Sequence, residues 1–324
     1  MGMQYSQLGR TGVQVSRLVL GTMNFGPYTE ESDAHAIMDR ALAEGINFFD
    51  TANVYGGEDH RGWTEEIVGR WLAASGRRDE VVLATKVYGQ MTKRTNDRGL
   101  SALNIRRAVE GSLRRLQTDH IDLYQMHHVD RDTPWDEVWQ AMDTLVTQGK
   151  ILYVGSSNFA GWHIAAACEA ARARHSLGLV SEQSLYNLTT RELELEVLPA
   201  AEHYGLGVIA WSPLAGGLLG GRPAEGDDGR RSRQADRPEA ARYRDQLERW
   251  ETFCSDRGFP PAQAALAWTL HRPGILGPII GPRTMEQLEA AVAALEIQLD
   301  DDALAAIDEI FPGPGGPAPE AYAW

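Results

Sequence analysis

The chain has 324 residues, of which 43% are hydrophobic and 23% charged. A chain of this length can bury roughly three quarters of its unfolded surface, enough for one large core or two ordinary domains. It carries 31 basic and 45 acidic residues, a net charge of −14, and a surface of that sign disfavours nucleic acid and acidic membranes as partners. The two cysteines, Cys168 and Cys254, lie far apart, which argues against a disulfide framework and a thiolate zinc site.

No apolar run approaches the roughly 20 residues that a membrane-spanning helix needs. The first ten residues are polar and lack the apolar stretch of a signal peptide. We therefore expect a cytoplasmic protein with no membrane and no nucleic acid among its partners.

Short apolar runs rich in Val, Ile and Leu alternate with longer amphipathic segments along the chain. Runs that are apolar at consecutive positions are typical of parallel strands buried on both faces, and the segments between them have the spacing of crossover helices. In chain order, the predicted strands span residues 15–20, 46–50, 81–86, 121–126, 151–154, 179–183, 207–211 and 275–280. The predicted helices span residues 32–44, 64–74, 101–116, 135–147, 160–174, 190–204 and 285–295.

Repeated strand–helix units over this length predict an α/β fold, a (β/α)8 TIM barrel. A doubly wound sheet would carry a glycine-rich phosphate loop after its first strand, and none follows here. Residues 5–15 predict a β-hairpin ahead of the barrel, and residues 216–238 predict a long polar loop at its C-terminal face. We expect one barrel domain over residues 1–311 and a Pro/Gly-rich tail over residues 312–324, whose Tyr322 and Trp324 either hang free or fold over a pocket mouth.

Polar side chains follow the apolar runs at the carboxyl ends of the predicted strands, where barrel enzymes place their chemistry. Asp50, Lys86 and His127 end or follow three successive strands, and Tyr55 lies in the loop after Asp50. A free phenol has a pKa near 10, too high for ready proton exchange at neutral pH. We expect Lys86 to lower the pKa of Tyr55 while Asp50 keeps Lys86 charged. The sequence thus predicts that Tyr55 is the general acid for a carbonyl oxygen that His127 orients.

Each of these residues also has a structural interpretation: a helix cap for Asp50, a surface loop position for Tyr55, a solvated side chain for Lys86. Four complementary groups at neighbouring strand ends favour the catalytic interpretation. The adjacent His127 and His128 raise the question of a metal site. Neighbouring strand residues point to opposite faces, and no carboxylate or cysteine lies at ligand spacing, so we predict that no metal is bound.

Six motifs at these positions make the chain similar to a known family. They are Leu20-Gly-Thr-Met-Asn-Phe-Gly26, Phe49-Asp-Thr-Ala-Asn-Val-Tyr-Gly56, Ala84-Thr-Lys86, Ile121-Asp-Leu-Tyr-Gln-Met-His127, Val154-Gly-Ser-Ser-Asn-Phe159 and Ala210-Trp-Ser-Pro-Leu214. The chain resembles the aldo-keto reductase superfamily, and most closely its bacterial and potassium-channel-β-like branch.

The resemblance implies an NADPH-dependent reductase, monomeric or a weak homo-oligomer, that acts on a small-molecule carbonyl substrate. It makes Tyr55 the proton donor, tuned by Lys86 and Asp50, with His127 orienting the carbonyl. The nicotinamide would be contacted by Gly21, Thr22, Met23, Ser157, Asn158, Gln183 and Trp211. The pyrophosphate and adenosine ends would be contacted by Ser212, Pro213, Leu214, Gly216, Arg222, Gly281, Arg283 and Gln287.

One segment departs from the branch, which has an acidic residue and an asparagine against adenine where this chain has Ala290 and Ala291. Arg283 remains for the adenosine 2′-phosphate, so we expect NADPH rather than NADH. Arginines in glycine-rich loops would also give an acidic protein the local positive charge that an anionic cofactor needs.

The expected function is reduction of an aldehyde or ketone to an alcohol by hydride transfer. A cofactor-sensing regulatory subunit is a second possibility. A third is a reductase of a sugar-nucleotide or polyketide intermediate, for which Arg230, Arg231 and Arg233 would supply further cations. The loops after the strands predict a substrate pocket lined by Phe25, Tyr28, Tyr88, His128 and Trp135.

Overall fold

The computed structural model describes residues 2–221 and 238–321, and its centre is a closed barrel of eight parallel strands. Around the barrel the strand order is β10-β3-β4-β5-β6-β7-β8-β9, so neighbours in space are neighbours in sequence except where β10 closes on β3. The strands are β3 (Val19–Gly21), β4 (Phe48–Asp50), β5 (Val82–Val87), β6 (Ile121–Met126), β7 (Ile151–Ser157), β8 (Leu179–Leu185), β9 (Gly207–Trp211) and β10 (Ile275–Ile280). This confirms the predicted (β/α)8 barrel.

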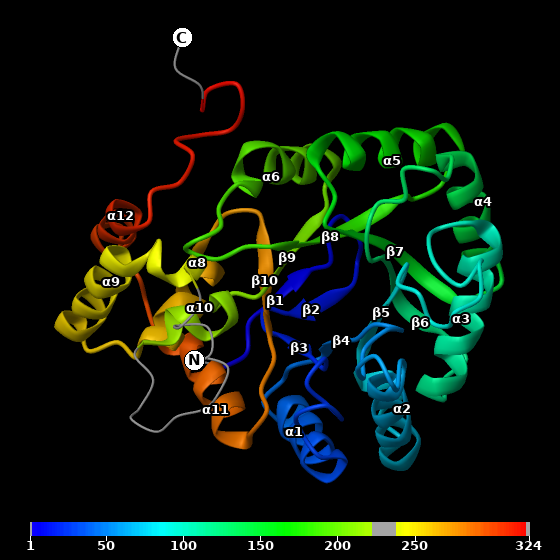
Figure 1. Cartoon of the computed structure of the whole chain (residues 1–324), viewed down its shortest axis with the longest axis horizontal. Coiled ribbons are helices and arrows are strands. Elements are labelled where there is room, and N and C mark those ends of the chain that lie inside the picture. Colours follow the sequence, from blue (N-terminus) through cyan, green and yellow to red (C-terminus); the bar gives the residue numbers. More distant parts are fainter. Residues whose placement is uncertain (1, 222–237, 322–324) are drawn as a thin grey trace.

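Helices pack around the outside of the barrel (Figure 1). They are α1 (Glu31–Ala43), α2 (Trp63–Ser75), α3 (Ala102–Leu116), α4 (Trp135–Thr147), α5 (Gly161–Ala173), α6 (Leu193–Tyr204), α8 (Pro238–Ala241), α9 (Arg244–Arg257), α10 (Pro261–His271), α11 (Met285–Ala293) and α12 (Asp301–Ile310). Short 3-10 turns lie at Arg78–Glu80, Ala215–Gly220 and Ala294–Glu296. In the part of the chain that is described, no helix is long and apolar enough to cross a membrane.

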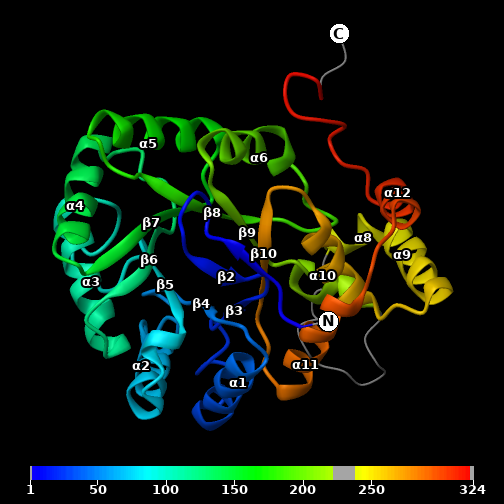
Figure 2. The ribbon, with the colours of Figure 1, turned by 180° about the vertical axis from the view of Figure 1, so that it is seen from behind.

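A β-hairpin closes the N-terminal end of the barrel. Its strands β1 (Tyr5–Gln7) and β2 (Gln14–Ser16) pair antiparallel, and Figure 2 shows them across the barrel opening. Leu8 and Val15 from the hairpin are fully buried against side chains inside the barrel. Gly9 has a positive φ of 57°, and a Cβ there would lie 2.2 Å from the Val180 carbonyl oxygen, so this close approach requires glycine. The predicted hairpin is confirmed.

The first predicted strand, residues 15–20, is wrong in its boundaries. Val15 belongs to the hairpin strand β2, and the first barrel strand, β3, begins at Val19. Between them the chain turns, because the Ser16 hydroxyl donates to the Leu18 carbonyl and the Arg17 amide donates to the Gln4 carbonyl. The stretch predicted as one strand thus belongs to two elements, the hairpin strand β2 and the barrel strand β3.

Other boundaries also differ from prediction. The strands β7 and β8 continue through serines to Ser157 and Leu185, so polar residues that bear on the site lie within strands. Helix α6 begins at Leu193 instead of 190, because the Asn187 side chain accepts bonds from Thr189 in a preceding turn. Most of the predicted loop, with Arg222, Arg230, Arg231 and Arg233, lies outside the described residues, as do Tyr322 and Trp324.

Candidate active site

The carboxyl ends of β4, β5 and β6 bring Asp50, Lys86 and His127 to one end of the barrel. Parallel pairing sets this register: Asp50 lies opposite Ala84, and Lys86 opposite Gln125. The Lys86 ammonium is completely buried and donates to Asp50 Oδ2 at 2.6 Å, to the Thr51 carbonyl at 2.9 Å and to the Tyr55 hydroxyl at 3.3 Å. The three donors of the ammonium are therefore all used, and one of them meets the phenol.

Tyr55 is held in a tight turn after β4. Its amide donates to the Ala52 carbonyl, and its own carbonyl accepts from the Gly62 amide at 2.9 Å. The ring lies edge-on to the His127 imidazole, with centroids 6.0 Å apart, and 5.0 Å from the Lys86 nitrogen. The structure thus brings together the four residues that the sequence singled out.

The charges in this group depart from one expectation. Burial raises the pKa of Tyr55 more than the neighbouring Lys86 lowers it, so the net shift is upward: Lys86 acts in the expected direction, but the effect of burial was not foreseen. Burial lowers the pKa of Lys86, but the charge of Asp50 and the contact with Tyr55 raise it overall. Lys86 therefore stays charged and Tyr55 stays protonated at neutral pH, which is the form that a proton donor needs.

His127 is a neutral imidazole at neutral pH. Burial lowers its pKa to about 3, with smaller contributions from the charges of Lys86 and His128. Its backbone amide donates to the Val87 carbonyl at 2.9 Å, which fixes the residue just beyond β6. A neutral ring carries one N–H, so His127 can donate one hydrogen bond without competing for the proton of Tyr55.

Two glutamines hold the other oxygen of Asp50. Gln125 and Gln183 donate to Asp50 Oδ1 at 3.0 and 2.8 Å, and both are buried inside the barrel. Gln125 was not predicted as a site residue. The signal was its position near the end of the predicted strand that leads to His127.

Asn158 connects His127 to Trp211. Its side-chain nitrogen donates to the His127 carbonyl at 3.2 Å and to the Ser157 hydroxyl, and its oxygen accepts from the Trp211 indole at 3.0 Å. Asn158 has a positive φ of 60°, a strained conformation that the surroundings must hold. The buried Glu182, which was also missed, helps to do so by accepting the Phe159 amide at 3.0 Å.

The chain after β9 has an unusual backbone. Ser212, Ala215, Gly216 and Gly217 all have positive φ, between 49° and 108°, as the chain enters the 3-10 turn. The turn is closed by its own hydrogen bonds, because the amides of Ala215 and Gly216 donate to the carbonyl and hydroxyl of Ser212. On the neighbouring strand β10, Gly281 and Arg283 follow the last residue, and the Arg283 guanidinium stacks on Tyr28 at 4.3 Å.

Aromatic rings extend from the four residues toward the outside. His127 stacks on His128 with centroids 5.3 Å apart, and His128 meets the edge of Tyr88 at 5.4 Å. The expectation that the two histidines point to opposite faces was wrong, because both lie beyond the end of β6 where strand alternation no longer applies. Among the described residues, no group of three or more His, Cys, Asp or Glu side chains could hold a metal ion.

The other predicted pocket residues are dispersed. Tyr28 is 59% exposed, whereas Phe25 is completely buried in the core between the barrel and the helices. The prediction that Phe25 lines a pocket does not fit this placement, since the loop that follows β3 folds it inward. Trp135, at the start of α4, packs on Phe159 with centroids 5.9 Å apart.

Comparison with known proteins identifies the family. The model of the aldo/keto reductase family matches residues 17–311. The chain belongs to the aldo/keto reductase family. The uncharacterized oxidoreductase YrpG of Bacillus subtilis (strain 168) is 56% identical to this chain over 99% of its length and 100% of YrpG.

Two more distant aldo/keto reductase relatives show how widely the fold is used. The protein Tas of Escherichia coli (strain K12) is 33% identical, over 98% of this chain and 100% of Tas. A probable voltage-gated potassium channel subunit beta of Oryza sativa subsp. japonica is 35% identical, over 91% of this chain and 92% of that protein. These relatives confirm the resemblance to this superfamily and to its potassium-channel-β-like branch.

Aldo/keto reductases generally use a nicotinamide cofactor, and the residues of this chain fit one. Trp211, fixed by Asn158, is partly exposed beside the His127 end of the barrel, and Met23 after β3 is 44% exposed. Arg283 adds a positive charge, and its amide donates to Gln287 Oε1 at 2.8 Å, which orders the start of α11. Another predicted cofactor contact, Arg222, lies outside the described residues.

Proposed function

We propose that this chain reduces an aldehyde or ketone to an alcohol with NADPH, and that Tyr55 donates the proton. The observation that carries the proposal is the buried Lys86 ammonium, which bonds both Asp50 and the Tyr55 hydroxyl. Membership of the aldo/keto reductase family supports an oxidoreductase that acts on carbonyls.

The cofactor, when bound, supplies the hydride that the carbonyl carbon accepts. The residues of the chain handle the oxygen, which gains negative charge as the hydride arrives and needs a proton to become a hydroxyl. Tyr55 is protonated at neutral pH and gives that proton, and the charge left on its phenolate is stabilised by Lys86 at 3.3 Å. His127, neutral in this site, donates a hydrogen bond that orients the carbonyl.

The choice of NADPH over NADH rests on Arg283. A guanidinium matches the 2′-phosphate with a planar fork of donors, and Tyr28 holds this one in place. We expect Arg283→Gln to raise the KM for NADPH far more than the KM for NADH, which steady-state assays with both cofactors measure. Equal KM increases for the two cofactors would count against NADPH as the preferred cofactor.

The proton-donor role is tested with Tyr55→Phe, which removes only the hydroxyl. We expect turnover to fall by roughly 10²–10⁴-fold, the usual size of a general-acid contribution. Quenching of NADPH fluorescence reports cofactor binding and should be unchanged, because the hydroxyl is not expected to contact the cofactor. Tyr153→Phe, which removes a hydroxyl on β7 outside the site, is the matched control. Loss of cofactor binding in Tyr55→Phe would instead give Tyr55 a structural role.

A regulatory, cofactor-sensing subunit is the second candidate, and the 35% identity to a probable potassium channel subunit beta supports it. NADPH oxidation followed by absorbance, with a panel of aldehydes, quinones, ketosteroids and keto-sugars, separates the two functions. Turnover of any of these substrates supports the reductase. Tight NADPH binding with no turnover across the panel supports the regulatory subunit.

A further inference from the structure

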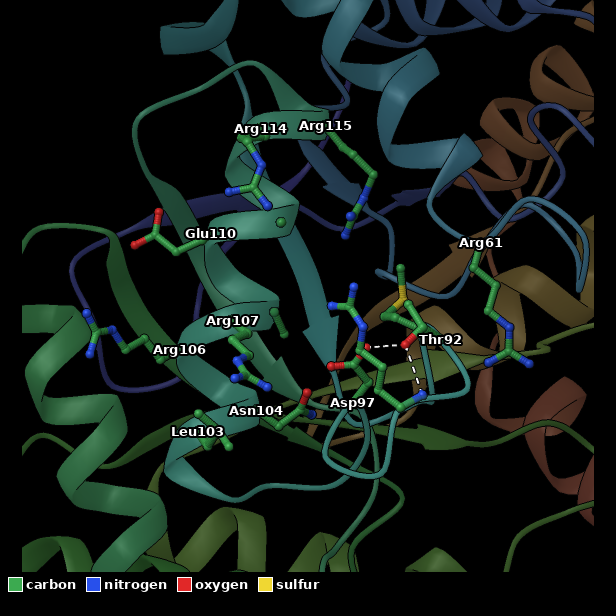
Figure 3. A pocket seen from close by; sticks show the side chains of 14 residues that line it. Arg61, Thr92, Asp97, Leu103, Asn104, Arg106, Arg107, Glu110, Arg114 and Arg115 are labelled. Carbon is green, nitrogen blue, oxygen red and sulfur yellow. Dashed lines mark hydrogen bonds between the residues drawn. The ribbon is translucent and has the colours of Figure 1, made fainter.

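A basic groove lies on the outside of the barrel. It has a volume of about 730 Å³ and is bounded by helix α3, the loop that precedes it and the residues just before α2 (Figure 3). We call it the arginine groove because six arginines line it: Arg61, Arg94, Arg106, Arg107, Arg114 and Arg115. Its lining contains none of the four residues around Lys86 and none of the predicted cofactor contacts.

The groove is strongly positive on a protein whose net charge is −14. Its two acidic lining residues are both engaged. Glu110 pairs with Lys150, and Asp97 accepts a hydrogen bond from the Thr92 hydroxyl. A hydrogen bond leaves the charge of Asp97 in place, so the lining carries six positive and two negative side chains and remains positive overall.

The fold braces the groove at Arg115. This arginine donates to the buried carboxylate of Glu65 at 2.8 Å and passes between two glycines. A Cβ on Gly62 would lie 2.6 Å from the Arg115 Cδ, and one on Gly111 would lie 3.1 Å from its Nη1. The loop on the opposite wall is held by a hydrogen bond within it, which the Met91 amide donates to the Asp97 carbonyl at 3.1 Å. Hydrogen bonds thus hold the backbone on both sides of the groove.

Four of the arginines have no acidic partner. Within residues 2–221 and 238–321, no salt bridge involves Arg94, Arg106, Arg107 or Arg114. Arg107 and Arg114 lie two turns apart on α3 (Figure 3), and both side chains are exposed to solvent. Like charges held close together repel one another, and an anion bound among them would relieve that repulsion.

We propose that the arginine groove binds a small ligand that carries two or more linked phosphate groups. Guanidinium forks match phosphate oxygens in geometry and in charge, and several forks around one space favour several phosphates over one. The volume is that of a small-molecule site and is too small for a folded partner. The proposal goes beyond the reductase function and does not depend on it.

The test is calorimetric titration of the full chain with sodium tripolyphosphate and, separately, with orthophosphate and citrate at one ionic strength. We expect tripolyphosphate to bind about tenfold or more tightly than either control, because each added charged hydrogen bond contributes a factor of that size. Equal affinities for the three anions would overturn the proposal. Adenosine triphosphate adds a nucleoside to the same phosphates and is titrated in the same way. Tighter binding of adenosine triphosphate than of tripolyphosphate indicates a nucleotide ligand, and equal or weaker binding indicates a free polyphosphate. Either result supports a polyphosphate site.

Paired variants locate the binding. Arg107→Glu/Arg114→Glu is expected to weaken tripolyphosphate binding about tenfold or more. Arg244→Glu/Arg249→Glu changes the net charge equally, on the exposed face of α9 across the barrel, and should leave the affinity unchanged. Equal weakening by both pairs would reduce the effect to net charge and overturn the proposal.

The remaining competitor is the predicted pyrophosphate contact region, which could itself bind tripolyphosphate. Repeating the titration with Arg283→Gln separates the two regions. Unchanged affinity in this variant supports the groove, and loss of binding in it assigns tripolyphosphate to the cofactor region and overturns the proposal. If the chain is a reductase, Arg107→Glu/Arg114→Glu should turn over substrate at the rate of the unmodified chain. If it is not, the calorimetric titrations still decide the proposal for the groove.

Discussion

Lys86 keeps its charge in a position that water does not reach. Taking an ammonium and a carboxylate out of water costs several kcal/mol each, and the contact between Lys86 and Asp50 offsets this only because every oxygen of Asp50 is also bonded. The donors to the second oxygen are Gln125 and Gln183. A buried ion pair of this kind is weak evidence for a contribution to stability. Its contact with the Tyr55 hydroxyl points instead to a functional role.

The pKa of Glu182 shifts in the direction that burial alone dictates, because no cation among the described residues pairs with its carboxylate. Burial raises its pKa to about 7, although Ser156, Ser184 and the Phe159 amide bond to it and act in the other direction. In the unfolded chain its pKa returns to the ordinary 4.5. The folded state therefore holds a proton that the unfolded state has lost between these two values, so the contribution of Glu182 to stability falls as the pH rises from about 4.5 to about 7.

We predict that Glu182→Gln removes this pH dependence. The amide keeps one acceptor oxygen and never ionises, so the free energy of unfolding of the variant relative to the unmodified chain should rise by about 3 kcal/mol between pH 4.5 and pH 8. Urea unfolding at both ends of this range measures it. The exposed Glu80→Gln is the control and should show no such change. A difference that stays flat with pH would contradict the burial of an ionising Glu182.

How far the sequence predicts this site depends on which side of a strand a residue faces. Asp50, Lys86 and His127 could be found because each stands at the end of an apolar run. Gln125 and Glu182 lie inside such runs, where alternation alone does not say which face points into the barrel and which toward the helices. That assignment comes from the register between strands, which only the closed barrel fixes.

At the scale of elements, continuous apolar runs located all eight barrel strands, and β6, β9 and β10 have the predicted bounds. The helices α8, α9, α10 and α12 were not predicted. Of these, α9 and α12 lie side by side at the periphery and directly precede no barrel strand, so they belong to no strand–helix unit whose repetition would reveal them (Figure 1). Their packing is tertiary, for example the edge contact of Trp250 with Phe311.

The contact between α2 and α3 gives an element-scale prediction. Gly69 lies where the two helices approach, and a Cβ there would stand 2.0 Å from the Arg115 carbonyl oxygen, which is backbone and cannot move aside. Alanine normally favours a helix over glycine by about 1 kcal/mol. We predict instead that Gly69→Ala lowers the free energy of unfolding by roughly 1–3 kcal/mol, as overpacking does.

Gly111→Ala on the facing helix is the matched control. Its nearest neighbour would be Arg115 Nη1 at 3.1 Å, which has to shift by only a few tenths of an ångström while Nε keeps its bond to Glu65, so the change should cost much less than Gly69→Ala. Urea unfolding of both variants makes the comparison. Equal free energies of unfolding for the two variants would contradict this prediction, because they would mean that α2 and α3 move apart easily enough to accept the Cβ at Gly69.

At the scale of the whole molecule, the two ends of the barrel have separate tasks. The hairpin fills the N-terminal end with Leu8 and Val15, while the polar network around Asp50 occupies the C-terminal end. A layer of apolar side chains that includes Phe48, Ala84 and Leu123 separates them. In barrels of this kind the first end serves stability and the second serves chemistry.

We predict that Leu8→Ala lowers the free energy of unfolding by roughly 2–5 kcal/mol, because Leu8 is fully buried and the hairpin backbone limits the collapse of the cavity. Turnover and KM of the folded variant should be unchanged, since the apolar layer stands between Leu8 and Lys86. Leu177→Ala makes the same deletion at a leucine that is 53% exposed and should cost little. Urea unfolding and steady-state assays below the transition give both quantities, and a loss of turnover that accompanies the loss of stability would show that the two ends are coupled.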